Sequence, residues 1–367
     1  MYTKTQQYKL FEDESSELSQ FPANINEENF LDSVTKLKAF NSIDILRSNV
    51  QKLKNWLLSL SPDTPLYETN PDYLLNELQQ IVEAQSLERA KYYAERLEKG
   101  ITQVKTTLIN DINLNRWKEY EDIHTDSLWI VDRRDSSGVH TAGYWGNFIP
   151  QIPQQMMKRY TKKGELVLDA FAGSGTTLIE SQRLGRKGIG IELQSEVAQT
   201  ARNLICTEPN VYNVLAEVVT GDSANIDFKV LLKQFNQKSA QLLILHPPYH
   251  DIIKFSDNPS DLSNAPSVES FLQMMSQVIK NASAVLDKGR YLIIVIGDKY
   301  SKGEWIPLGF YTMNEALKLG FSLKSTIVKN FEETTGKRSQ KELWRYRALA
   351  RGFYVFKHEY IFVLQKK

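Results

Sequence analysis

The second half of the chain, from about residue 165, alternates short apolar runs with longer segments of helical spacing. Helical spacing separates the early runs at Thr177–Leu184, Ser195–Ile205 and Val268–Leu286. Short β-branched runs between helices are typical of a parallel sheet with helices on both faces. The pattern predicts an α/β fold whose seven strands are Leu166–Phe171, Gly188–Leu193, Ala216–Thr220, Leu242–Leu245, Tyr291–Ile296, Leu323–Val328 and Tyr360–Leu364.

The first half has a different pattern, which is helical from about residue 30 to about residue 115. Its clearest stretch repeats apolar residues at intervals of three and four, which places them along one side of a helix. This seam consists of Leu87, Ala90, Ala94, Leu97, Ile101, Val104 and Leu108. We interpret it as part of a helical hairpin buried in its own domain. The alternative is a homodimer that forms through the N-terminal helices. The change of pattern predicts a helical domain over residues 1–125 and an α/β domain over 126–367.

Composition narrows the class of protein. The 367 residues are 41% hydrophobic and 24% charged, as in ordinary globular proteins, and the formal net charge is +1. A nucleic-acid surface would therefore have to come from local clustering of basic residues. Cys206 is the single cysteine, so no internal disulfide can form, and the chain suits a reducing compartment. No run of about eighteen uncharged apolar residues occurs, so we expect a cytoplasmic protein without a membrane segment.

The first apolar run leads into a glycine-rich loop, DAFAGSGTT (169–177). Gly173 and Gly175 permit a tight turn and let a ligand approach the backbone ahead of a helix. The loop lacks the third glycine of the dinucleotide pattern and the Gly-Lys-Ser/Thr of triphosphate sites. The next run ends in Glu192, about twenty residues on, where a carboxylate can bind a ribose diol. Because Asp222 and Ser223 follow the third run, the strand ends predict an adenosine site without a phosphate site.

DAFAGSGTT, followed by GIGIEL (188–193) and later HPPY (246–249), resembles the S-adenosylmethionine-dependent amino-methyltransferases of DNA, which act on cytosine N4 or adenine N6. GYWGNFIPQIP (143–153) is similar to the family segment that closes over the methionine end of the cofactor. The likeness covers roughly residues 140 to 367, in the motif order of a circularly permuted class. It implies a Rossmann-like class I methyltransferase fold, with a mostly parallel seven-stranded sheet and an antiparallel last strand. The α-helical N-terminal region has no counterpart in the family that we can match. That region would be an accessory part for DNA recognition or dimerisation.

The resemblance also implies which residues bind the cofactor, S-adenosylmethionine. Glu192 is implied at the ribose, and Asp222 with Ser223 near the adenine. No Cys/His cluster has metal-ligand spacing, and direct methyl transfer needs no metal. The residues implied around the methionine moiety are Asp169, Phe171, Gly173, Gly175 and Thr176, with Phe148 and Pro150 from the closing segment.

The fourth run ends in the implied catalytic residues His246, Pro247, Pro248 and Tyr249. An exocyclic amine is a poor nucleophile, because its lone pair is delocalised into the ring. An acceptor at position 246 and the carbonyl of Pro247 can take hydrogen bonds from both amine hydrogens, which favours a pyramidal nitrogen that attacks in line. The prolines hold these acceptors rigidly, and Tyr249 can stack on a base swung out of the duplex.

His246 departs from the family pattern, which has Asp, Asn or Ser at this position. A neutral imidazole still offers one acceptor nitrogen. Within the family, Asp or Asn tends to go with adenine and Ser with cytosine, so a neutral histidine favours cytosine N4. A structural histidine in an inactive site is the alternative. His250 is interpreted as a loop residue, and Asp298 either as part of the base pocket or rim or as a solvated turn.

A basic segment with interleaved aromatic residues lies between the last two runs, over residues 331–357. Basic side chains contact phosphates, whereas aromatic ones such as Trp344 and Tyr354 can stack or wedge. We therefore expect double-stranded DNA as the partner, over the alternative of a solvated charged face. The expected phosphate contacts are Lys337, Arg338, Lys341, Arg345, Arg347 and Arg351.

Three functions remain open at this point. A site-specific DNA methyltransferase is the leading one. An enzyme of the same fold that methylates guanine N2 of transfer RNA is the runner-up, since related motifs occur there. A catalytically silent DNA-binding regulatory protein is the third, and the histidine at position 246 is its only support. Arg133, Arg134 and His140 form a second candidate group for DNA contact.

Overall fold

The computed structural model describes residues 21–61, 66–140, 143, 146–250, 252–331 and 341–367. It divides into two compact units, one of residues 1–107 with 112–122 and one of residues 108–111 with 123–367. Each unit has a buried core of its own. The helical unit thus ends at residue 122, close to the boundary expected at residue 125.

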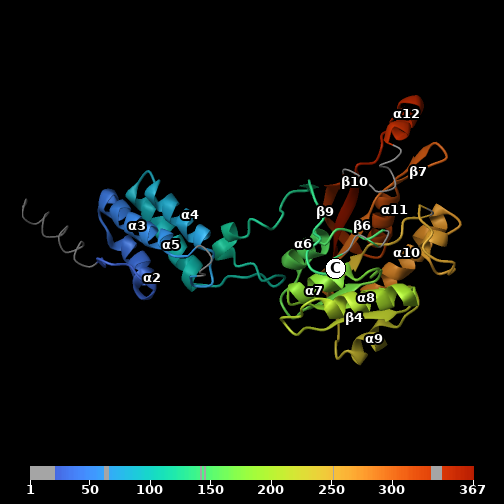
Figure 1. Ribbon diagram of the computed structural model, residues 1–367, viewed down its shortest axis with the longest axis horizontal. Helices are drawn as coiled ribbons and strands as arrows, with labels where there is room; N and C mark the ends of the chain where they lie inside the picture. Colours follow the sequence, from blue (N-terminus) through green and yellow to red (C-terminus); the bar gives the residue numbers. More distant parts are fainter. Residues whose placement is uncertain (1–20, 62–65, 141–142, 144–145, 251, 332–340) are drawn as a thin grey trace, which may run out of the picture. The chain divides into compact units, whose positions relative to one another are not determined.

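The N-terminal unit is a helical bundle (Figure 1). Its longer helices are capped by Asn26, Ser42, Asn70 and Ser86, whose side chains accept a hydrogen bond from a backbone amide of the first turn. These caps satisfy amides that have no partner inside the helix. The elements are α2 (Glu27–Lys36), η1 (Leu37–Ala39), α3 (Ile43–Leu58), α4 (Pro71–Val82), α5 (Leu87–Thr102) and η2 (Leu114–Glu119).

The apolar seam of α5 faces the core of its own unit. Ala94 and Leu97 are fully buried there among apolar residues of α2, α3 and α4. The expectation that the seam continues to Leu108 is wrong, because Gln103 is extended and ends the helix. Val104 and Leu108 are 78% and 89% exposed. The helical part of the seam therefore packs within its own unit and presents no apolar stripe to a second chain.

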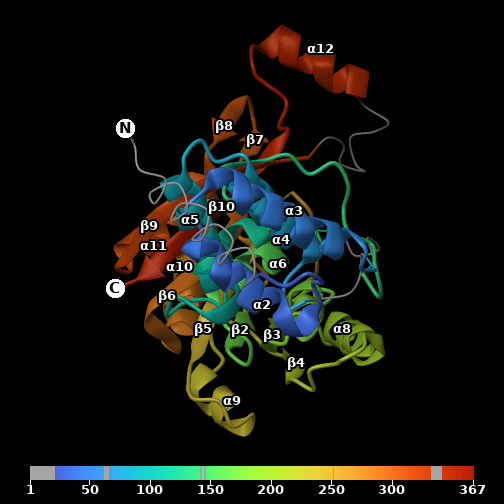
Figure 2. The ribbon, with the colours of Figure 1, turned by 90° about the vertical axis from the view of Figure 1, so that its left-hand side faces the viewer.

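The second unit contains an eight-stranded sheet in the order β1-β9-β10-β6-β5-β2-β3-β4. Strand β10 is antiparallel to both its neighbours, and the other pairs are parallel. Figure 2 shows β6, β5, β2, β3 and β4 following one another across the sheet. The strands are β1 (Leu128–Trp129), β2 (Leu166–Asp169), β3 (Lys187–Glu192), β4 (Ala216–Thr220), β5 (Ala240–Leu245), β6 (Leu286–Ile296), β9 (Phe321–Asn330) and β10 (His358–Lys366).

All seven expected strands are present, and the mostly parallel sheet with an antiparallel last strand is confirmed. Two details differ from the expectation. The additional strand β1 is a two-residue edge strand beside β9, too short to show in the hydrophobic pattern. Leu286 begins β6, whereas the pattern placed it in the preceding helix, which ends at Ser283.

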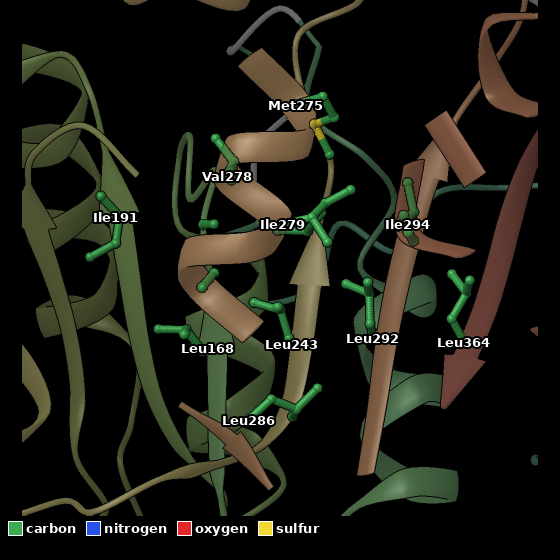
Figure 3. Close-up of a cluster of buried hydrophobic side chains, with 14 of the residues drawn as sticks. Leu168, Ile191, Leu243, Met275, Val278, Ile279, Leu286, Leu292, Ile294 and Leu364 are labelled. Carbon is green, nitrogen blue, oxygen red and sulfur yellow. The ribbon is translucent and has the colours of Figure 1, made fainter. Parts of the chain in front are cut away.

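Helices cover both faces of the sheet. Along β5, Leu243 and Leu245 join a core with α9, α10 and α11, whereas Leu242 and Ile244 join another with α6. Successive strand residues point to opposite faces, so a strand buried on both sides appears as an unbroken apolar run. Figure 3 shows the first core, where Ile279 of α10 lies over the strands. The helices are α6 (Gln151–Tyr160), α7 (Thr176–Arg183), α8 (Ser195–Thr207), α9 (Phe228–Gln234), α10 (Val268–Ser283) and α11 (Leu308–Lys318).

Strand β3 approaches α7 closely because it carries glycine where the two elements meet. A methyl group added at Gly190 would lie 2.8 Å from Cβ of Ala172 and 2.9 Å from Cδ1 of Leu178. Dinucleotide-binding folds obtain this close helix–strand packing from the third glycine of their loop. Here Gly190 of β3 allows the close packing, so the loop does not need a third glycine for it.

Three further elements lie outside the sheet. Strands β7 (Lys299–Ser301) and β8 (Glu304–Ile306) form a hairpin between β6 and α11. Helix α12 (Lys341–Arg351) belongs to the basic segment, and both views show it beyond this hairpin, away from the sheet (Figures 1 and 2). None of the described helices is both long and apolar enough to span a membrane.

Candidate active site

A cleft of about 1110 Å³ opens at the carboxyl edge of the parallel strands. Residues that follow β2 to β6 form its wall, because parallel strands bring their carboxyl ends to one edge. The expected site residues that line the cleft are Phe148, Phe171, Gly173, Glu192, Asp222, Ser223, His246, Pro247, Pro248 and Tyr249. Four expected cofactor residues do not line it, namely Pro150, Asp169, Gly175 and Thr176.

Two glycines shape the loop between β2 and α7. Gly173 and Gly175 have φ angles of +50° and +86°, a conformation that other residues rarely adopt. The amide of Gly173 donates to Oε2 of Glu192 over 3.0 Å, which ties the loop to the end of β3. Gly175 lies behind the loop, where an added methyl group would be 3.1 Å from Cδ1 of Ile205. It therefore supports the cleft wall from the side of α8.

Asp169 and Thr176 act in the same indirect way. The carboxyl of Asp169 is buried beneath the loop, and its Oδ1 accepts from the amide of Phe171 over 2.9 Å. Burial raises the pKa of Asp169 to about 6. The buried Thr176 hydroxyl donates to Oδ1 of Asn147 over 2.7 Å. Pro150 is buried at the start of α6.

Glu192 is the buried carboxylate of the cleft. It accepts from the amides of Gly173 and Gln194 at 3.0 and 2.9 Å, and burial raises its pKa. Each carboxylate oxygen has further acceptor capacity, so the side chain can still bind a hydroxyl group of a ligand.

Asp222 and Ser223 complete this side of the cleft from the end of β4. Asp222 accepts from the amide of Ala224 over 2.9 Å and from the side chain of Asn225 over 2.7 Å. Ser223 donates to the carbonyl of Ala170 over 2.8 Å. The Ser223 bond joins the ends of β2 and β4, and Asp222 keeps acceptor capacity toward the cleft.

Asn147 fixes the segment ahead of α6 onto the glycine loop. Its amide nitrogen donates to Oγ of Ser174 over 2.8 Å, while its amide oxygen accepts from Thr176. Arg134 donates to the carbonyl oxygens of Asn147 and Phe148 over 3.2 and 2.8 Å. Asn147 was not expected at the site, although a lone amide between a glycine and an apolar pair is a signal that could have indicated it.

The second candidate group for DNA contact has a structural role instead. His140 is buried, and its Nε2 lies 2.7 Å from Oε1 of Glu180. Arg134 binds the two backbone carbonyls just described. The expectation for His140 is therefore wrong, because its side chain is buried, whereas Arg134 is half-buried and lines the cleft and Arg133 is exposed.

His246 lines the cleft between two aromatic rings. Phe148 stacks on it with a centroid distance of 4.8 Å, and Tyr249 meets it edge-on at 6.0 Å. The ring is partly open to the cleft, and neither of its nitrogens has a hydrogen-bond partner among the described residues. The surrounding protein excludes enough water to lower the pKa of His246 to about 4. The imidazole is therefore neutral at pH 7 and presents one acceptor nitrogen.

Tyr249 is linked to two residues of the last strands. Its hydroxyl donates to Oε2 of Glu359 over 3.2 Å, and Nζ of Lys329 donates to Oε1 of Glu359 over 3.0 Å. Burial raises the pKa of Tyr249 well above its usual value, so the hydroxyl keeps its proton. Lys329 and Glu359 face each other in the register of β9 and β10. Sequence motifs give no signal for them, because Glu359 lies 110 residues beyond Tyr249.

The family model described as DNA methylase matches residues 7–203 and 240–367 of the chain. The chain belongs to this family. The match includes most of the helical N-terminal region, whereas the sequence motifs resemble the family only from about residue 140.

Individual relatives are similar over parts of the chain. Type II methyltransferase M.MjaII of Methanocaldococcus jannaschii is 41% identical over 56 residues, 15% of this chain and 10% of that protein. Type II methyltransferase M2.DpnII of Streptococcus pneumoniae is 34% identical over 100 residues, 26% of this chain and 34% of that protein. A probable tRNA (guanine(10)-N2)-dimethyltransferase of Methanothermococcus thermolithotrophicus is 28% identical over 140 residues, 38% of this chain and 74% of that protein. The chain thus spans a tenth to about a third of the two type II methyltransferases.

The residues at the ends of β2, β3 and β4 fit S-adenosylmethionine. Glu192 and Asp222 offer carboxylate oxygens for ribose hydroxyls and an adenine amine. Gly173 lines the cleft without a side chain, which leaves room for a ligand against the backbone. Phe148 and Phe171 supply apolar surface. Within the described residues, no three His, Cys, Asp or Glu side chains gather as metal ligands.

Two further polar residues hold the loops around the catalytic motif. His250 is buried, with Nε2 2.9 Å from the carbonyl of Ala265 and Nδ1 2.9 Å from Nζ of Lys299. Asp298 is 8% exposed and accepts from Nε1 of Trp305 and from the hydroxyl of Tyr360. Asp298 is therefore not a solvated turn: it lines the cleft and anchors the β7–β8 hairpin.

An aromatic rim continues the cleft toward the basic segment. It consists of two ring pairs, Tyr300 with Phe353 at 4.2 Å and Trp305 with Phe356 at 4.1 Å, together with Tyr354. The pairs anchor the segment after α12 to the β7–β8 hairpin. Tyr354, between the anchored rings in sequence, lines the cleft and is 86% exposed.

Helix α12 carries four of the six expected phosphate contacts, and the side chains of three of them are described. Arg345 and Arg351 are exposed, and the guanidinium of Arg347 lies 5.2 Å from the ring centroid of Trp344. Trp344 lines the cleft, whereas the three arginines do not. Lys337, Arg338 and the side chain of Lys341 lie outside the part of the chain that the structure describes.

Proposed function

We propose that the chain is a DNA methyltransferase that transfers a methyl group from S-adenosylmethionine to N4 of a cytosine flipped into the cleft. The carrying observation is His246, a neutral ring whose nitrogens have no partner among the described residues, in the same cleft as the cofactor-binding residues. Membership of the DNA methylase family supports this class of reaction.

His246 and Pro247 prepare the amine for attack. Its two hydrogens are donated to the imidazole nitrogen and to the Pro247 carbonyl, which draws the nitrogen lone pair out of conjugation. The cofactor supplies an electrophilic methyl group, and the electron pair of the broken bond stays on its sulfur. The amine nitrogen forms the new bond to carbon and then loses one proton to His246, which passes it to water. A ring with a pKa of about 4 suits this role, because it stays unprotonated until the strongly acidic methylated amine donates.

Aromatic residues hold the flipped base in place. Tyr249 provides a stacking face whose position is fixed by its bond to Glu359, and Phe148 closes over His246. The two prolines remove amide donors and keep the loop rigid. Cytosine is the preferred target over adenine because the acceptor at position 246 is neutral.

Double-stranded DNA is the proposed partner, bound along the aromatic rim and α12. The exposed Arg345 and Arg351 suit phosphate contacts. The exposed Tyr354 suits the space that a flipped base leaves in the duplex. Base chemistry in a duplex requires such a flip, since the amine is otherwise paired.

One experiment tests the proposal. The protein is incubated with S-adenosylmethionine labelled in its methyl group and with either plasmid DNA or transfer RNA, and the product is digested to nucleosides. Label in 4-methylcytosine supports the proposal in full, while label in 6-methyladenine supports the enzyme class and overturns the base. Absence of label from DNA, with tight DNA binding retained, would favour a silent regulatory protein.

A transfer-RNA guanine-N2 methyltransferase is the second candidate. The observation in its favour is the similarity over 140 residues to a protein named as a probable tRNA (guanine(10)-N2)-dimethyltransferase. Label recovered as methylguanosine from RNA, with none from DNA, would establish this function instead.

A further inference from the structure

We propose that Lys329 and Glu359 read the target base, and that they select cytosine through its N3 and O2 atoms. The inference rests on the proposed function and adds a determinant of specificity outside the HPPY motif. It concerns two side chains that line the cleft from β9 and β10, directly opposite each other in the register of the sheet.

The ammonium group of Lys329 has unused hydrogen-bond donors. Its side chain is 6% exposed, and that of Glu359 is 12% exposed. The bond to Glu359 is the one hydrogen bond that Nζ makes with a described residue, and the Phe331 ring lies 5.9 Å away. An ammonium has three donors, and buried donors are normally satisfied. Since Lys329 lines the cleft, the missing acceptors are expected on a ligand.

The pair presents donors to the cleft because the carboxylate of Glu359 is already engaged. One of its oxygens accepts from Lys329 and the other from Tyr249. The carboxylate is thereby neutralised, and its bond to Tyr249 couples the stacking ring to the ammonium. A ligand in this corner meets a cation with free donors rather than an acceptor.

The pair is also near the catalytic acceptor. The charges of Glu359 and Lys329 both act on His246, the first raising and the second lowering its pKa. A base whose amine meets His246 and whose face lies on Tyr249 therefore turns its neighbouring edge toward Lys329. The chemistry of that edge distinguishes the bases.

Cytosine offers the matching edge. Next to the N4 amine it carries two acceptors in succession, N3 and O2. Adenine carries one acceptor, N1, followed by a carbon-bound hydrogen, and guanine carries the N1 donor next to its N2 amine. An ammonium with two free donors can bond both acceptors of cytosine. On adenine it can bond a single acceptor, and on guanine its donors face another donor.

The test compares a cytosine with an analogue that lacks one acceptor. Once the methylated sequence has been mapped on plasmid DNA, duplex oligonucleotides are made with cytosine or 3-deazacytosine at the target, the latter keeping its amine and O2. The wild type is compared with Lys329→Met, and Lys324→Met serves as the matched control, because Lys324 is exposed on the same strand. Cofactor affinity, measured by calorimetry, confirms that each variant is folded.

We expect the wild type to lose about 10- to 100-fold in kcat/KM on the analogue, the range of a hydrogen bond to a charged group. Lys329→Met should lose a similar factor on cytosine but little more on the analogue, whereas Lys324→Met should behave as the wild type. Any effect of the analogue on amine reactivity is common to both enzymes and cancels. Because methionine leaves Glu359 unpaired, the double variant Lys329→Met/Glu359→Gln repeats the comparison without a lone buried charge.

Different results overturn different statements. If Lys329→Met still loses the full factor on the analogue, Lys329 does not contact N3 and the inference is wrong. If the wild type methylates adenine instead of cytosine, the proposed enzyme class stands, whereas the proposed base and its selection by Lys329 are wrong. If the wild type transfers no methyl group to any DNA, the proposed function itself fails.

Discussion

The two halves of the cleft are built in different ways. The cofactor half, at the ends of β2, β3 and β4, is held by contacts over shorter sequence separations, 19 residues between Gly173 and Glu192 and 53 between Ala170 and Ser223. The base half joins Tyr249 to Glu359 across 110 residues. Motifs with fixed spacing can therefore describe the first half, whereas the second depends on which strands become neighbours.

The halves also differ in charge. The cofactor half presents carboxylates, Glu192 and Asp222, which suit hydroxyl and amine donors. The base half presents the neutral His246 and an ion pair, Lys329 with Glu359, whose charges offset each other. Under the proposed function, the first half binds the cofactor and the second positions a neutral base for attack, so variants in each half should change different measured quantities.

The largest effect is expected in the base half. His246→Ala removes the acceptor that activates the amine, so single-turnover methyl transfer should fall by about 10²- to 10⁴-fold. The affinity for S-adenosylmethionine should stay within a few-fold of the wild type. His124→Ala is the control, because that histidine is exposed in the same unit. Full activity in His246→Ala would show that methyl transfer does not depend on an acceptor in the base half.

The reciprocal variant lies in the cofactor half. Glu192→Ala removes a charged acceptor for the ribose, so the Kd for the cofactor, measured by calorimetry, should rise about 10- to 100-fold. At saturating cofactor the rate of transfer should return close to that of the wild type. Glu196→Ala, at an exposed position of the following helix, should leave the Kd unchanged. A loss of rate that saturation cannot restore would place Glu192 in the chemistry instead.

A variant in the aromatic rim tests whether opening of the DNA duplex depends on a residue outside both halves of the cleft. Tyr354→Ala should slow methylation of a paired duplex about 5- to 100-fold, the range of one stacking contact. A mismatch opposite the target base should restore the rate, because the base then leaves the stack more easily. Tyr346→Ala is the matched control, since Tyr346 is exposed on α12 but does not line the cleft. Equal loss on paired and mismatched DNA would argue against a wedge.

Phosphate contact on α12 should have a smaller effect. Arg345→Ala should weaken DNA binding a few-fold for all sequences and reduce the salt slope by about 1. The measurement is fluorescence anisotropy with a labelled duplex over a series of salt concentrations. Lys233→Ala, an exposed position on α9, provides the control. An unchanged slope in Arg345→Ala would exclude Arg345 as a phosphate contact.

The smallest effect is expected from pH. Because the pKa of His246 is lowered from 6.5 to about 4, single-turnover rates should vary by less than about 2-fold between pH 8 and pH 5.5. Loss of half the rate near pH 6.5 would show that the ring is not withdrawn from water.

The shifted pKa values of His246 and Asp169 make the free energy of unfolding change with pH in opposite directions. The stability linked to neutral His246 is present above pH 6.5 and is lost as the pH falls toward about 4. The stability linked to protonated Asp169 is present below pH 3.8 and is lost as the pH rises through about 6. Urea unfolding of His246→Ala and Asp169→Asn across this range separates the two contributions.

Elements with local causes could be predicted from the amino-acid sequence. The central strands could be predicted because residues buried on both faces of a sheet must be apolar in succession, as in Leu242–Leu245. The glycine loop and the HPPY motif were visible because φ angles and rigid turns are properties of single residues and their neighbours.

Features that depend on partners far apart in the chain could not be predicted and are set by the packing of the fold. The tertiary structure placed Asp169 beneath the loop rather than in the cleft, enclosed His140 and His250, and ended the seam of α5 before Val104. It also set Lys329 opposite Glu359, two residues that any strand sequence could contain. Burial and hydrogen bonding are properties of the packed sheet, so a charged residue in an apolar run acquires its partner, and with it a candidate role, only when β9 and β10 pair.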